Sequence, residues 1–78
     1  MQALRNEFIE EIVAIKEGAA SGRDMTDDLC DEIGDYYEAV NSSNDPALLA
    51  AFNTVQSGVD ATCEEQATLA QQALELLA

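Results

Sequence analysis

The sequence predicts an all-α fold, a small antiparallel bundle of three helices in a single domain over residues 1–78. Helix-favouring alanine, leucine, glutamate and glutamine dominate the composition, and proline occurs only once. Apolar residues recur every three or four positions, which is the period of a helix with one buried face. Two groups of glycine and small polar residues divide the chain into three periodic segments. Because 47% of the residues are apolar, we expect a folded core rather than an acidic disordered tail.

The first helix is predicted over about residues 2–18. Its core-facing stripe has helical spacing and consists of Leu4, Phe8, Ile12 and Ile15, widened by Ile9 and Val13. Arg5 and Lys16 project close to the widened edge, so the margin of this apolar face is basic. We expect that margin to seat the acidic helix that follows. The stretch from Gly18 to Arg23 supplies the glycines and small residues of a helix end and a loop.

The second helix is predicted over about residues 25–40, with Asp24 or Thr26 as its N-cap. Its core stripe stays in phase over four turns and consists of Met25, Leu29, Ile33, Tyr36 and Val40. A second line of residues flanks this stripe, namely Cys30, Gly34 and Tyr37. Tyr37 therefore lies at the margin of the core, where part of its ring is expected to be buried.

The outward side of the second helix is acidic, and we call it the acidic face. It consists of Asp27, Asp28, Asp31, Glu32, Asp35 and Glu38. Like charges meet at i,i+4 in the pairs Asp24/Asp28, Asp27/Asp31, Asp28/Glu32 and Asp31/Asp35. Each pair costs about 0.2–0.5 kcal/mol at low salt, so the four together cost roughly 1–2 kcal/mol. This arrangement is poor for the folding of a small domain.

The third helix is predicted over about residues 46–77, with Asp45 as N-cap and Pro46 at the first helical position. Its apolar residues keep one phase throughout and are Leu48, Phe52, Val55, Val59, Cys63, Ala67, Ala70, Leu74 and Leu77. Because the phase continues through Gly58, one long helix is favoured. The alternative is a break at Ser57-Gly58, with Asp60 capping a fourth helix.

A long third helix would extend about twice as far as the other two, so its apolar end needs cover. This end contains Leu74 and Leu77. We expect the first helix to bury it, and a homodimer is the alternative.

The negative charge is concentrated in one part of the chain. No lysine, arginine or histidine occurs between Asp24 and Ala78, where twelve carboxylates lie. The first 23 residues hold four carboxylates and three basic residues, a net −1, so the remainder carries −12 of the total −13. Such a surface is repelled by nucleic acid and by anionic membranes, so we expect direct binding to neither. A basic protein surface is the complementary partner.

The sequence also predicts a soluble, cytoplasmic protein. No apolar run approaches the roughly 20 residues that cross a bilayer. The N-terminal segment is interrupted by Glu7, Glu10 and Glu11, whereas a signal peptide has an uninterrupted apolar centre.

We expect neither catalysis nor a bound metal or cofactor. The chain lacks histidine, and Cys30 and Cys63 lie 33 residues apart. Both cysteines are expected to be reduced and in or near the core, with an interhelix disulfide as the alternative. The spacing Asp24-x-Thr26-x-Asp28 is like the start of a calcium loop, but Leu29 occupies the glycine position and the twelfth residue is not glutamate.

In its length and its acidic helices, the chain resembles acyl carrier proteins. That family carries phosphopantetheine on the serine of an Asp-Ser-Leu motif at the head of the second helix. Here the region reads Asp24-Met-Thr-Asp-Asp28-Leu29 and contains no serine. The resemblance is therefore limited to composition and does not imply the cofactor.

Three interpretations of the acidic face remain open. It is a solvated surface, such as a high-salt adaptation of a structural or adaptor protein. It imitates a nucleic-acid backbone and blocks a basic site, as inhibitors of anti-CRISPR or anti-restriction type from phages and mobile elements do. Or it belongs to an antitoxin or immunity protein that docks on a basic partner. For the binding interpretations, the predicted contact residues are the acidic face and Tyr37, an apolar anchor.

Overall fold

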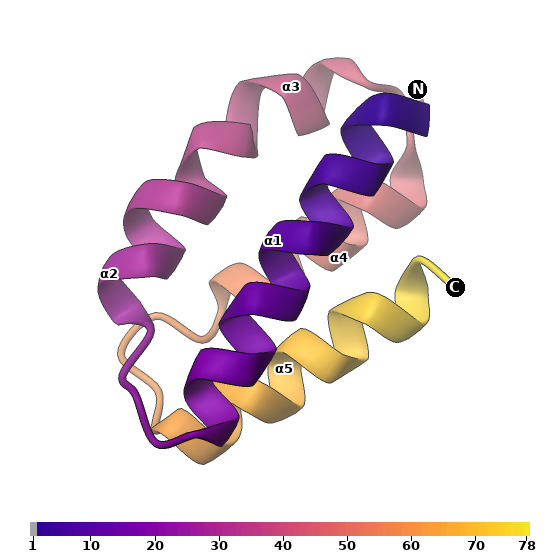
Figure 1. Cartoon of the computed structure of the whole chain (residues 1–78). Coiled ribbons are helices and arrows are strands. Elements are labelled where there is room, and N and C mark those ends of the chain that lie inside the picture. Colours follow the sequence, from indigo (N-terminus) through magenta and orange to yellow (C-terminus); the bar gives the residue numbers. More distant parts are fainter. Residues whose placement is uncertain (1) are drawn as a thin grey trace.

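The computed structural model describes residues 2–78, which form four helices and no strand. In chain order the elements are α1 (Gln2–Ala20), α2 (Thr26–Asp28), η1 (Leu29–Ile33), η2 (Gly34–Tyr36), α3 (Tyr37–Ser42), α4 (Pro46–Gln56) and α5 (Cys63–Leu76). The elements from α2 to α3 follow one another without a gap, and we call this run, residues 26–42, the acidic helix (Figure 1). The predicted all-α bundle is thus confirmed, in its four-helix form.

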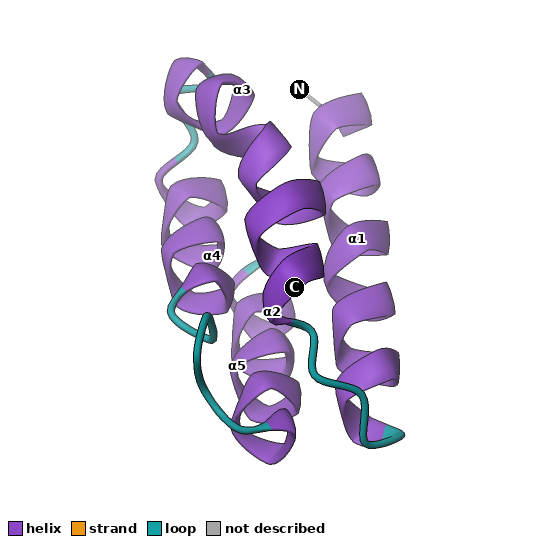
Figure 2. Cartoon of the chain, turned by 90° about the vertical axis from the view of Figure 1, so that its left-hand side faces the viewer, coloured by secondary structure: helices purple, strands orange, loops and turns teal. Residues whose placement is uncertain are grey.

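The helices pack so that α1 and α4 both lie between the acidic helix and α5. The acidic helix contacts α1 and α4, and α5 packs on the same two helices. Figure 2 shows the acidic helix in front, with α1 and α4 on either side and α5 behind. One long side of the acidic helix is therefore left without a neighbouring helix.

The core is built from the stripes that the helical period predicts. Its large buried apolar side chains include Phe8, Ile12, Ile15, Leu29, Ile33, Val40, Leu48, Phe52 and Val55. Leu4 and Tyr36, at the ends or margins of their stripes, are only partly buried. In α5 the buried apolar residues include Ala70 and Ala73, whose small side chains let this helix approach its neighbours closely.

The favoured continuous helix over residues 46–77 is wrong, because α4 ends at Gln56 and α5 begins at Cys63. The backbone of Asp60 has a φ of 68°, in the left-handed region. Thr62 caps α5 in place of Asp60. Its side-chain oxygen accepts a hydrogen bond from the Glu65 N–H at 3.2 Å, and its hydroxyl donates to the Glu65 carboxylate at 3.0 Å. Thr62 and Glu65 have the spacing of a capping box, but the Glu65 carboxylate pairs with the Thr62 hydroxyl in place of the Thr62 backbone N–H. The Thr-x-x-Glu spacing favours the start of a new helix at this point.

The break has a packing consequence, because it lets α5 fold back along α4 and α1. Gly58 lies buried at the turn, where an added Cβ would stand 3.2 Å from the Val55 carbonyl oxygen and 3.3 Å from Leu29 Cδ1. Leu77 is 6% exposed, so the apolar end of α5 is covered within the chain. Because α5 packs on both α1 and α4, the expected cover by α1 is one part of this packing.

The acidic helix is irregular in its middle. A π turn over η1 is followed by a 3₁₀ turn over η2. The first is wider than an α turn and the second is tighter, so their effects on the helical phase offset each other. Leu29, Ile33 and Val40 consequently all stay buried. At the start of the helix, the Asp24 carboxylate accepts hydrogen bonds from the Thr26 N–H at 3.0 Å and the Thr26 hydroxyl at 2.7 Å.

Gln66 connects the break to the start of the acidic helix. Its side chain is almost fully buried, with 1% exposed, and its oxygen accepts a hydrogen bond from the Met25 N–H at 2.8 Å. Its amide nitrogen donates to the Gly58 carbonyl at 3.1 Å and to side-chain oxygens of Asp24 and Thr26 at 3.2 Å. One side chain therefore fixes three segments of the chain.

We predict that Gln66→Leu lowers the free energy of unfolding by about 1–3 kcal/mol. The leucine would leave the Met25 N–H buried without a partner, at about 1–3 kcal/mol, whereas the Gly58 carbonyl would keep its hydrogen bond from the Ala61 N–H at 2.9 Å. Urea denaturation measures the loss. Gln72→Leu is the matched control, since Gln72 is exposed on the same helix and should change stability by less than about 0.5 kcal/mol. Equal stability of both variants would refute the role of Gln66.

Candidate protein-binding surface

The residues predicted to contact a partner all lie along the acidic helix. Five carboxylates are exposed, namely Asp27, Asp31, Glu32, Asp35 and Glu38, and Asp28 is half-buried. The Tyr37 side chain is 58% exposed. The buried residues of this helix occupy its other side, so the acidic face points toward solvent.

Little positive charge reaches the acidic face. Arg23 lies 3.7 Å from the Asp28 carboxylate, and the Arg23 side chain is 69% exposed and that of Asp28 39%, so this ion pair contributes little to stability. Within residues 3–78, whose side chains the structure describes, the five exposed carboxylates make no hydrogen bond or ion pair. No basic side chain of residues 3–78 is therefore paired with these five carboxylates.

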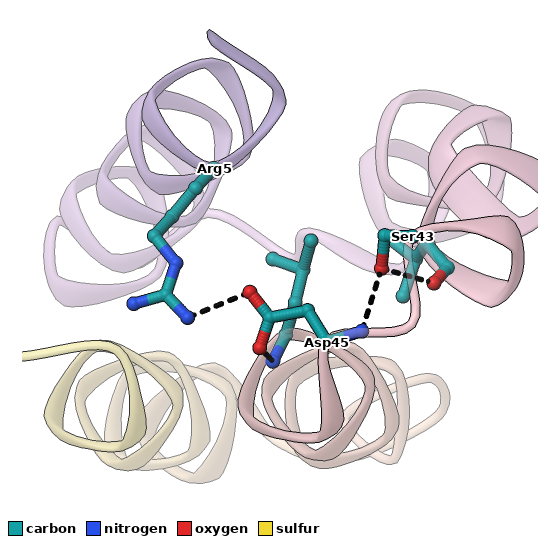
Figure 3. A network of polar contacts seen from close by, with 5 residues as sticks. Arg5, Ser43 and Asp45 are labelled. Atoms are coloured by element: carbon teal, nitrogen blue, oxygen red, sulfur yellow. Dashed lines mark hydrogen bonds and ion pairs between the residues drawn. The ribbon is translucent and has the colours of Figure 1, made fainter. Parts of the chain in front are cut away.

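The expectation that the basic margin of the first helix seats the acidic helix is wrong. Arg5 of α1 donates a hydrogen bond to the Asp45 carboxylate at 2.7 Å, ahead of α4 (Figure 3). Lys16 donates to the side-chain oxygen of Gln71 on α5. The reason is the rotation of α1, which turns its basic edge toward α4 and α5. The acidic face is left without these two cations.

The acidic surface extends onto α1 beside Tyr36. The Tyr36 ring packs edge-on against Phe8, with ring centroids 5.2 Å apart. Burial raises the pKa of the Tyr36 hydroxyl, and nearby carboxylates raise it further. These carboxylates are Glu11, Glu7 and Glu10 of α1 and Glu32 of the acidic helix. Sequence reasoning missed the contribution of α1 because the period of one helix does not reveal which neighbour it faces.

The cysteines supply no further chemistry to this surface. Both thiols are free, and the Cys63 thiol donates to the Gly22 carbonyl at 3.5 Å. Cys30 is exposed, so its predicted place in or near the core is wrong. It lies on the flanking line of the acidic helix, at the exposed margin of the core. The alternative of an interhelix disulfide is also excluded, and no group of three potential metal ligands occurs in the described part of the chain.

The surface of the described residues contains two hollows that bear on binding. The larger, about 470 Å³, lies over the start of α5 and is lined by Thr62, Glu64, Glu65, Thr68 and Leu69. Its polar groups already bond within the helix, since Thr62 pairs with Glu65 and the Thr68 hydroxyl donates to the Glu64 carbonyl. The smaller, about 270 Å³, lies between α3 and α4. The smaller hollow is the one that adjoins Tyr37 along the acidic helix.

No family model, curated protein or solved structure matches this chain. Over residues 2–78, the helices are too short or too polar to cross a bilayer.

We predict that the ion pair at the start of α4 makes stability depend on pH in the acid range. The hydrogen bond from Arg5, with help from the Leu48 N–H, lowers the pKa of Asp45 below its ordinary 3.8. Because this pKa is lower in the folded than in the unfolded state, the stabilisation is present above about pH 3.8 and is lost as the pH falls through the folded pKa.

Urea denaturation of the wild type and Asp45→Asn over a range of pH tests this prediction. The stability difference should be constant from about pH 5 to 7 and shrink below about pH 3.8. In an Arg5→Gln background the pH-dependent part should be smaller, since the main cause of the pKa shift is gone. A difference that does not change with pH would contradict the assignment.

Proposed function

We propose that this chain is a non-enzymatic protein-binding module whose acidic face occupies a basic, nucleic-acid-binding site on another protein. The observation that carries the proposal is the set of exposed carboxylates on one side of the acidic helix, which have no partner among residues 3–78. Positive charge on a partner would supply the compensation that the chain itself lacks after Arg23.

The acidic face suits this role because it is both charged and rigid. Carboxylates at i and i+4 recur about every 6 Å along a helix, giving a row of negative charge comparable to a nucleic-acid backbone. Leu29, Ile33 and Val40 anchor the opposite side of the same helix in the core. Little conformational entropy is then lost on binding, and the charges steer a basic partner toward the face.

The energetics of the free chain favour the same conclusion. Three like-charge i,i+4 pairs lie within the acidic face, namely Asp27/Asp31, Asp28/Glu32 and Asp31/Asp35. Together they oppose folding by roughly 0.6–1.5 kcal/mol at low salt. A basic partner would remove this repulsion, whereas the free protein only screens it with salt. The face is thus better adapted to a bound state than to the isolated fold.

Small acidic helical proteins of this behaviour are typical of phages and mobile elements. By that analogy we extend the proposal to an inhibitor of anti-CRISPR or anti-restriction type, acting in the cytoplasm where enzymes that handle nucleic acid work. It would block a lysine- and arginine-lined groove by occupancy, and it would need no cofactor or catalytic group.

We predict that Asp31→Asn with Asp35→Asn stabilises the free protein while it weakens partner binding at least tenfold. The double change removes the Asp27/Asp31 and Asp31/Asp35 repulsions, which should add roughly 0.4–1 kcal/mol at low salt and almost nothing at 1 M salt. Binding should weaken because two of the charges that face the partner are lost.

The measurement is capture of partners from a cell lysate, identification by mass spectrometry, and titration of the captured protein with each variant. Asp60→Asn with Glu64→Gln is the matched control, because it removes the same charge away from the acidic helix. DNA or RNA should displace the wild-type chain from its partner.

A partner that nucleic acid does not displace would instead indicate an antitoxin or immunity protein. A stability gain with unchanged binding would show that the face only solvates the fold.

A further inference from the structure

We propose that the hollow between α3 and α4 receives a bulky apolar side chain from a basic segment of the partner protein. This inference rests on the function proposed above and adds an anchoring point at one edge of the acidic face. The hollow measures about 270 Å³ and is lined by Val40, Asn41, Asn44, Asp45, Pro46 and Leu49.

An exposed apolar edge runs beside the hollow. Tyr37 is 58% exposed and Leu49 is 36% exposed, and together with Leu76 they are the exposed large hydrophobic residues of the described chain. The Tyr37 ring packs on Phe52, with centroids 5.8 Å apart. That contact lies about one helical turn from Asn41 and Leu49 on the two helices. The ring is therefore held in place and ready to contact a ligand without further ordering.

The size and polarity of the hollow fit a side chain with its backbone. Sites for small molecules usually enclose about 300–1,000 Å³, which is more than this hollow offers. Asn41 and Asn44 are exposed at its rim, and within residues 3–78 their side-chain amides make no hydrogen bonds. They are free to bond the backbone of a bound segment, while Leu49 and Pro46 contact its apolar side chain.

The surrounding charge identifies the occupant as basic. Glu38 follows Tyr37 directly in the chain, and Asp35 and Asp31 continue the acidic face along the same helix. The guanidinium of the nearby Arg5 is already paired with the Asp45 carboxylate. A second copy of this chain would bring another net charge of −13 to the contact, so self-association through this edge is disfavoured. A basic segment with one large apolar residue satisfies both the hollow and the carboxylates.

Selection of random peptides on the wild-type chain tests the proposal. Selected peptides should be rich in lysine and arginine and share one position occupied by Leu, Ile, Met, Phe or Trp. Replacing that peptide residue by serine should weaken binding at least tenfold. Leu49→Asn in the protein should weaken binding of the parent peptide by a similar factor. It should hardly change binding of the serine-substituted peptide, because both changes remove the same contact.

Leu76→Asn is the matched control, since Leu76 is equally apolar and 46% exposed on α5. It should leave peptide affinity unchanged. The leucine methyl NMR signals of the wild-type chain provide a readout that needs no variant, and the signals of Leu49 should shift on binding of the parent peptide.

The failure of this inference is distinguishable from the failure of the proposed function. Two outcomes would overturn the anchoring hollow alone. In the first, the selected peptides are basic but share no apolar position. In the second, they share one, but their binding is unaffected by Leu49→Asn and does not shift the NMR signals of Leu49. Peptides without basic enrichment, or binding that Asp31→Asn with Asp35→Asn does not weaken, would overturn the proposed function as well.

Discussion

The contact among four aromatic rings determines how the acidic helix is oriented. Phe8 of α1 packs against Tyr36 at 5.2 Å and Phe52 at 6.0 Å, and Tyr37 packs against Phe52 at 5.8 Å. These are the two phenylalanines and two tyrosines of a chain without tryptophan. Tyr36 packs on α1, and the adjacent Tyr37 packs on α4. These two contacts fix the rotation of the acidic helix about its own axis. Its carboxylates can then face only solvent.

This orientation opposes the electrostatics of the isolated chain. A domain of 78 residues has only a few kcal/mol of net stability, and the three like-charge pairs of the acidic face reduce it by roughly 0.6–1.5 kcal/mol. The aromatic contacts and the buried hydrogen bonds of Gln66 offset this repulsion without neutralising it. The basic residues that could neutralise it are used elsewhere, since Arg5 binds Asp45 and Lys16 binds Gln71. The fold is therefore secured by packing, and the charge is left available at the surface.

Local patterns predicted most of the helices, whereas features that depend on contacts between helices were missed. The Asp45-Pro46 start was correct because a cap and a proline act within one turn. The sequence favours one continuous helix over a break after α4, because the apolar phase continues past Gly58. The Thr-x-x-Glu spacing of Thr62 and Glu65 was the local signal against continuity. The burial of Gln66 had no such signal, since its partners Met25 and Gly58 come from distant segments.

The carboxylates of this chain fall into two classes, and the division bears on what the acidic face is for. One class stabilises the starts of helices, where the carboxylates accept hydrogen bonds. Its members are Asp24, Asp45 and Glu65. Asp31, Asp35 and Glu38 lie beyond the first turn of the acidic helix, where the helix dipole no longer favours them. A surface that served only solvation would not need such charges to be gathered on one helix beside an exposed tyrosine. Their placement is unfavourable for the free chain and favourable only when positive charge is brought to it, which is the property expected of a binding surface.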